Sequence, residues 1–135
     1  PKKNNFDIYQ NAPYITPNLN EIKIVIKTDS NNFNIIEEKT KKLCNDINSN
    51  ILITKSENGL SLVKMNGDVI NIEGEKISNP DVTGAGDTVI ASFALSILNK
   101  NSEKESAKFA NQAASKVVQK NATSTVSIKE IVKVT

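Results

Sequence analysis

The alternation of apolar and polar residues predicts a strand followed by a helix near the start of the chain. Residues 12–16 form a short, mostly apolar run that predicts a strand. Residues 19–26 fit a helix or a strand equally well by hydrophobic period alone. We predict a helix there, because Asn18 is a suitable N-cap and Glu21 follows three residues later, in a variant of the capping box.

The middle of the chain predicts a helix, a buried strand and a hairpin. Apolar residues recur at helical spacing between residues 34 and 48, with charged residues between them. Residues 50–54 form a continuous apolar run with β-branched side chains, which is typical of a buried parallel strand. The Asn66-Gly67 pair lies between the runs 60–64 and 69–73 and predicts a β-hairpin.

The last third of the chain predicts helices that follow a glycine-bearing turn at residues 79–87. A helix rich in small and apolar residues is expected from about residue 85 to residue 98. Residues 103–120 predict an amphipathic helix with an apolar stripe of Ala and Val, and residues 127–132 predict a short final helix. Strands that alternate with helices indicate one α/β domain with a mainly parallel sheet and a small β-hairpin.

Composition narrows the class of function. The chain has 135 residues and a net charge of +2, with all positive charge on Lys and no Arg, His or Trp. A charge this small and dispersed argues against nucleic-acid binding, and no apolar run is long enough for a membrane span. The lack of His excludes a His-based triad or a His-ligated zinc site. Without Arg, any phosphate must be held by Lys, backbone N–H groups or a metal ion.

Cysteine content and the first residue add two expectations. Cys44 is the only cysteine, so no internal disulfide can form, and we expect a cytoplasmic location. Its place in a helical pattern predicts a packing role. The chain starts at Pro1 rather than Met, and we interpret it as a fragment of a longer protein.

Candidate chemistry centres on the run from Thr83 to Thr88, Thr-Gly-Ala-Gly-Asp-Thr. Glycines let a turn approach a ligand, and free N–H groups at a helix N-terminus favour an anion. A carboxylate suits this place if Asp87 faces a hydroxyl beside a phosphate and accepts its proton as the oxygen attacks. The run is neither a Walker A loop nor a Rossmann fingerprint. From the residues alone, a phosphoryl-transfer base and a simple glycine-rich N-cap both remain open.

The segment from Asp81 to Thr88 resembles the C-terminal signature of the ribokinase-like (PfkB) carbohydrate kinases. The resemblance implies that Asp87 is the catalytic base. It implies an anion hole made by the backbone amides of Gly84, Ala85 and Gly86. It also places Asp81 in a site for a monovalent cation such as K⁺. The expected fold is the three-layer α/β domain of that family, of which this chain would be the C-terminal half.

A second motif, Asn18-Leu-Asn-Glu21, is similar to the Asn-x-x-Glu that helps this family to hold Mg²⁺ and phosphates. An amide and a carboxylate suit a hard, water-rich Mg²⁺ site. Taken alone, the pair is explained by a capping box. Its position upstream of the glycine turn, in the order that the family requires, favours the metal role.

Two further positions resemble parts of the family's ATP site. Residues 53–59 look like the strand and turn that line the nucleotide phosphates, and Gly59 would allow the turn. The expected nucleotide contacts there are Thr54, Lys55 and Ser56. Asn111 resembles a position on the helix that borders the adenine, although a solvated helix residue is an equal alternative.

The most similar subgroup is the heptose 7-phosphate kinases, which act in ADP-heptose synthesis for lipopolysaccharide. The similar stretches are Pro1-Lys2-Lys3 with Phe6, Tyr9 and Ala12, then Thr16-Pro17-Asn18, residues 81–91 and residues 122–127. They imply ATP-dependent phosphorylation of a sugar or sugar phosphate, and a homodimer for the full-length protein. Because the sugar-binding N-terminal half is missing, we expect this chain to be inactive alone. The alternatives are another sugar (ribose, fructose or a ketodeoxy sugar acid), a non-catalytic nucleotide-binding module, or an α/β domain whose glycine turn is only a cap.

Overall fold

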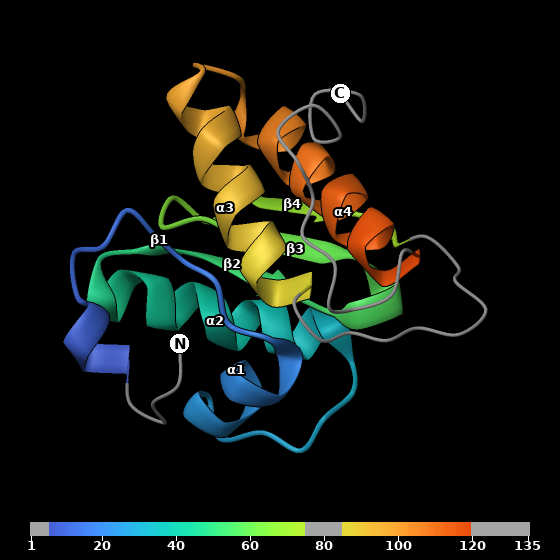
Figure 1. The fold of residues 1–135 in the computed structure, drawn as a ribbon. Coiled ribbons are helices and arrows are strands. Elements are labelled where there is room, and N and C mark those ends of the chain that lie inside the picture. Colours follow the sequence, from blue (N-terminus) through green and yellow to red (C-terminus); the bar gives the residue numbers. More distant parts are fainter. Residues whose placement is uncertain (1–5, 75–84, 120–135) are drawn as a thin grey trace. The chain divides into compact units, whose positions relative to one another are not determined.

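The computed structural model describes residues 6–74 and 85–119 (Figure 1). Two compact units divide the chain: unit 1 comprises residues 1–55 and 61–71, and unit 2 comprises residues 56–60 and 72–135. The chain changes from one unit to the other just after β2 and again within β3 and within β4, so no separate linker joins the units. The elements in order are η1 (Phe6–Tyr9), β1 (Tyr14–Ile15), α1 (Leu19–Val25), α2 (Phe33–Ile47), β2 (Asn50–Thr54), η2 (Ser56–Asn58), β3 (Leu60–Val63), β4 (Val69–Ile72), α3 (Ala85–Leu98) and α4 (Glu103–Gln119).

The described strands form one four-stranded sheet in the order β1-β2-β3-β4. Strands β1 and β2 are parallel, with Tyr14 opposite Asn50 and Ile15 opposite Ile51, which confirms the predicted parallel strand at 50–54. The connections from β2 to β3 and from β3 to β4 are too short for a crossover, so these neighbours run antiparallel. The α/β class is confirmed.

The core of unit 1 lies where α1 and α2 contact β2 (Figure 1). Helix α2 presents one buried stripe at helical spacing, formed by Ile36, Thr40, Cys44 and Ile47. The Cys44 side chain is fully buried, and its Sγ donates to the carbonyl oxygen of Val63 at 3.4 Å. The predicted packing role of this cysteine is therefore confirmed. Other buried core residues of the unit are Phe6, Ile15, Ile22, Ile51 and Ile53.

The predicted hairpin at Asn66-Gly67 is present, and its turn has three loop residues. The N–H of Gly67 donates to the carbonyl of Lys64 at 3.0 Å, and the N–H of Lys64 donates to the carbonyl of Asp68 at 2.9 Å. Gly67 has φ +93°, whereas Asn66 is not among the positive-φ residues. This is the form in which a type I turn is followed by a left-handed glycine.

Unit 2 contains the packed pair α3 and α4, which confirms both predicted helices (Figure 1). Ala107, Ala110 and Ala113 form the buried stripe of α4, and small side chains let the two helices approach closely. Buried hydroxyls join the helices, because Ser106 Oγ donates to Ser96 Oγ at 2.9 Å. None of the described helices is long and apolar enough to cross a membrane. The predicted helix at 127–132 lies outside the described residues.

Candidate active site

In unit 1, the carboxyl ends of β1 and β2 bring two of the predicted motifs together. The ladder between these strands continues past β1, because the N–H of Thr54 donates to the carbonyl of Pro17 at 3.0 Å. Asn18 and Thr54 then form a parallel bridge. The start of the Asn-x-x-Glu motif therefore lies beside the strand end of the second motif, at the edge of a parallel pair where α/β proteins bind ligands.

The Asn-x-x-Glu motif forms a complete capping box at the start of α1. The N–H of Glu21 donates to Oδ1 of Asn18, and the N–H of Asn18 donates to Oε2 of Glu21, both at 2.8 Å. The cap leaves the second carboxylate oxygen, Oε1 of Glu21, outside its hydrogen bonds. Among the described residues, no three metal-ligating acids, cysteines or histidines gather at one point. An amide and a carboxylate are ligand types that a water-rich Mg²⁺ site uses, and the metal role of Asn18 and Glu21 stays a prediction.

Lys55 follows β2 directly, and its side chain is held against α2 within unit 1. Its Nζ lies 4.5 Å from the centroid of the Phe33 ring, which is a cation–π contact. The residue is 8 % exposed. Burial lowers the pKa of the Lys55 ammonium, and the nearby carboxylate of Glu37 partly opposes this shift. The structure thus gives Lys55 a protein partner, while its predicted contact with the nucleotide stays a prediction.

The predicted phosphate-lining turn, in unit 2, has left-handed backbone at both ends. Ser56 has φ +52° and Gly59 has φ +86°, and the N–H of Gly59 donates to the carbonyl of Ser56 at 3.1 Å. A Cβ atom at Gly59 would lie 1.9 Å from the carbonyl oxygen of Ile72. Glycine is required here both for its backbone angle and for space, so Gly59 allows the turn as predicted.

Asn111 lies on α4, and its side chain is buried within unit 2. It is 8 % exposed, and its Nδ2 donates to the carbonyl oxygen of Glu73 at 3.1 Å. The interpretation as a solvated helix residue is therefore wrong, because the side chain is buried and bonded. That Asn111 borders the adenine of the nucleotide stays a prediction.

The glycine turn runs into the first turn of α3. The helix begins at Ala85, so Ala85, Gly86 and Asp87 are its first three residues. The first four N–H groups of a helix have no partner inside it, which gives the predicted anion hole a backbone basis. The side chain of Asp87 is not described, and Gly84 and Asp81 lie outside the described residues.

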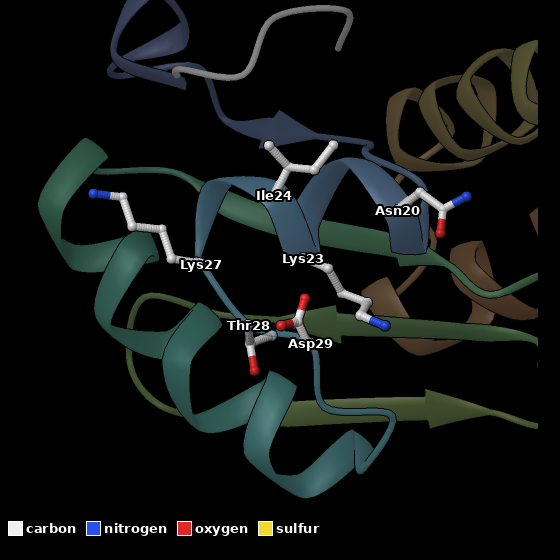
Figure 2. A pocket seen from close by; sticks show the side chains of 6 residues that line it. All are labelled: Asn20, Lys23, Ile24, Lys27, Thr28 and Asp29. Atoms are coloured by element: carbon white, nitrogen blue, oxygen red, sulfur yellow. The ribbon is translucent and has the colours of Figure 1, made fainter.

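A hollow on α1 and the loop after it lies in unit 1 (Figure 2). It measures about 480 Å³ and contains none of the predicted site residues. The side chain of Lys23 on its wall already donates to Oδ1 of Asn31 at 2.8 Å. We assign this open hollow no role in the candidate site. Its lining residues are Asn20, Lys23, Ile24, Lys27, Thr28 and Asp29.

Comparison with known proteins decides the family. The sequence profile of the "pfkB family carbohydrate kinase" group matches residues 6–130. This chain belongs to the PfkB family. Its curated relatives include the bifunctional protein HldE of Hydrogenovibrio crunogenus, which is 39% identical over 132 residues, covering 97% of this chain and 27% of HldE. HldE of Escherichia fergusonii is 38% identical over 131 residues, covering 97% of this chain and 28% of that protein. The PfkB chain thus spans less than a third of the length of these relatives.

Solved structures confirm the ribokinase-like fold of the PfkB chain. Ribokinase of Thermotoga maritima has a TM-score of 0.79 and 25% identity, covering 94% of this chain and 43% of that one. Ribokinase of Arabidopsis thaliana, solved with ribose and ATP, has a TM-score of 0.74 and 26% identity, covering 90% and 40%. Phosphofructokinase-2 of Escherichia coli, solved with potassium, has a TM-score of 0.82 at 16% identity, covering 95% and 41%, and supports the fold alone.

Two contacts in this PfkB chain, made by Gly74 and by Phe33, were not predicted from the sequence. Gly74 lies against the turn Ser56–Gly59, and a Cβ atom there would be 1.9 Å from the carbonyl oxygen of Glu57. An isolated glycine just after a strand is a weak signal of such close approach. The second contact is the cation–π contact between Phe33 and Lys55. It joins segments that are distant in sequence, so no local pattern predicts it.

Proposed function

We propose that this chain is the ATP-binding and catalytic part of a larger sugar kinase. The observation that carries the proposal is the bridge between Asn18 and Thr54, because it joins two family motifs 36 positions apart at one sheet edge. The helical start at Ala85 supports it independently, because it places Ala85, Gly86 and Asp87 in a first turn, where the N–H groups have no partner within the helix itself. Membership of the PfkB family gives the reaction class.

In the proposed reaction, the carboxylate of Asp87 accepts the proton of the sugar hydroxyl. The hydroxyl oxygen forms a bond to the γ-phosphorus of ATP, and the bond from that phosphorus to the β–γ bridging oxygen breaks, releasing ADP. The amides of Gly84, Ala85 and Gly86 donate to the transferred group as its charge spreads. One such donor is typically worth about 3 kcal/mol of barrier.

The remaining predicted residues bind the nucleotide and its ions. Glu21 and Asn18 orient the water shell of Mg²⁺, which neutralises phosphate charge when bound. Asp81 contributes to a K⁺ site; the related phosphofructokinase-2 was solved with potassium. Thr54, Lys55, Ser56 and Gly59 line the phosphates, and Asn111 borders the adenine; ATP is present in the Arabidopsis ribokinase structure.

For the acceptor, we propose the anomeric hydroxyl of a heptose 7-phosphate. The sequence resemblance to the heptose kinases and the identity of 39% to a bifunctional HldE protein support this choice. Another sugar is the second candidate, because ribokinases share the fold. The sugar-binding part would come from the remainder of a larger protein.

Calorimetry of ATP–Mg²⁺ binding tests the nucleotide part of the proposal. We expect the chain to bind, and Gly84→Val to abolish binding because its side chain obstructs the anion hole. If Gly84→Val still binds ATP–Mg²⁺, the phosphates do not bind at the glycine turn, and this part of the proposal is wrong. The acceptor is tested on the full product of the gene, with heptose 7-phosphate, ribose and fructose 6-phosphate compared by kcat/KM; a preference for either other sugar would overturn the heptose assignment.

A further inference from the structure

Residues Ile72–Gly74, which end β4 and follow it, contact two other segments of unit 2. These segments are the turn Ser56–Gly59 and helix α4, through Asn111. These two neighbours are the positions proposed to line the phosphates and to border the adenine. One short segment therefore contacts residues proposed for both the phosphate part and the adenine part of the nucleotide site.

The contact with the turn is made by main chain against main chain. A Cβ atom at Gly74 would lie 1.9 Å from the carbonyl oxygen of Glu57 and 2.6 Å from the backbone nitrogen of Gly59. A Cβ atom at Gly59 would in turn lie 1.9 Å from the carbonyl oxygen of Ile72. Backbone atoms cannot swing aside as a flexible side chain can, so any residue larger than glycine must push the two segments apart.

The contact with α4 holds the same segment through a side-chain hydrogen bond. The buried Nδ2 of Asn111 donates to the carbonyl oxygen of Glu73 at 3.1 Å. Loss of a buried hydrogen-bond partner is costly, so this bond resists movement of the segment relative to the helix. The spacing between the turn and α4 is thus set through Ile72–Gly74.

We propose that Gly74 is a positioning residue for the nucleotide: its backbone contact with the turn sets where the phosphate-lining amides lie relative to the adenine-bordering helix. This inference rests on the proposed function. Gly74 acts through the turn residues Glu57 and Gly59, whose backbone atoms it contacts. Moving the turn should weaken binding of the phosphates and spare the adenosine moiety.

The chain offers a matched series of glycine substitutions. Gly74 is absent from the positive-φ residues, so Gly74→Ala tests close approach alone. Gly67 has φ +93° and nothing within 4 Å of an added Cβ, so Gly67→Ala tests backbone strain alone. Gly59→Ala combines both effects, with φ +86° and the clash at Ile72.

Two measurements on the 135-residue chain test the proposal. In amide hydrogen exchange without nucleotide, we expect Gly74→Ala to accelerate exchange at the amides of residues 57–59, and Gly67→Ala to leave them unchanged. In calorimetry with Mg²⁺, we expect Gly74→Ala to weaken ADP binding about tenfold or more while adenosine affinity stays within about twofold, since displaced donors lose bonds to charged phosphates. A merely structural loss would lower both affinities alike.

The outcomes separate this inference from the proposed function. If the unaltered chain binds no ADP, the proposed function fails. If it binds and Gly74→Ala changes neither the exchange nor the ratio of ADP to adenosine affinity, the positioning role alone fails. Should Gly74→Ala not fold, the unaltered chain still gives a test, because saturating ADP is expected to slow exchange at Glu73 and Gly74 along with the turn. Protection confined to the turn would overturn the coupling.

Discussion

Replacing Glu21 by Gln separates a helix cap from a metal-binding role. Gln keeps a side-chain oxygen that can accept the Asn18 N–H, and capping boxes use Glu or Gln at this position. The second hydrogen bond, from the Glu21 N–H to Oδ1 of Asn18 at 2.8 Å, does not involve the changed side chain. The substitution therefore preserves the cap and removes the negative charge.

The two roles differ in the size and place of the expected effect. As a cap, Glu21 loses only its charge interaction with the helix N-terminus, which costs about 0.3–1 kcal/mol of unfolding free energy. As a group that holds the water shell of Mg²⁺, it loses a hydrogen bond to a charged group, typically about 1.5–3 kcal/mol. That loss corresponds to an increase of about 10- to 150-fold in the Kd for ATP–Mg²⁺.

Calorimetry with ATP in Mg²⁺ and with ATP in a chelator measures the binding effect, and urea unfolding measures stability. Glu105→Gln is a matched control, because Glu105 lies in the first turn of α4 and its N–H donates to the capping hydroxyl of Ser102 at 3.1 Å. We expect both variants to lose similar stability and only Glu21→Gln to lose Mg²⁺-dependent affinity. Equal binding by both variants would refute the metal role and leave Glu21 as a cap.

Three further predictions concern stability and reactivity. Ser92 has a fully buried hydroxyl with no partner among the described residues, so Ser92→Ala should raise the unfolding free energy in urea by about 1 kcal/mol, whereas a decrease would contradict this account. Burial lowers the pKa of Lys55 in the folded chain below its usual value of 10.5, so the buried ammonium opposes folding at pH values below the lowered pKa. Between the lowered pKa and 10.5, the folded chain loses this proton first, and the unfolding free energy should rise with pH. Lys55→Met should show a smaller rise over this pH range, and equal slopes for the two proteins would contradict the account. Burial raises the pKa of Cys44 to about 11, so a thiol reagent at pH 8 should modify it no faster than the chain unfolds, and fast labelling of the folded chain would be inconsistent with this burial.

Local patterns were sufficient for the elements whose partners are close in sequence. The helix at α1 was predicted from Asn18 and Glu21, and both hydrogen bonds of that cap are present at 2.8 Å. The β-branched run at 50–54 correctly indicated a parallel partner, because only a strand covered on both faces tolerates so continuous an apolar run. The directions of β3 and β4 follow from their short connections, which the same patterns located.

The candidate site was less accessible from sequence, because its contacts join distant segments. The burial of Asn111 depends on the carbonyl of Glu73, 38 positions earlier, and a helical polar residue gives no sign of such a partner. The fit of Gly74 against Glu57 is equally non-local. Motif resemblance predicted the candidate site residues, whereas the packing around them depends on contacts between segments that are distant in sequence.

The capping box at Asn18 and Glu21 is compatible with the metal site that we propose there. The cap uses Oδ1 of Asn18 and Oε2 of Glu21, and it leaves Oε1 outside. A carboxylate already held in one rotamer loses less conformational entropy when it orients the water around a cation, since that ordering is completed on folding. The bridge from Asn18 to Thr54 places this held carboxylate near the end of a parallel strand pair, where phosphates commonly bind. An Asn-x-x-Glu that caps its helix is therefore better prepared for Mg²⁺ than one that does not.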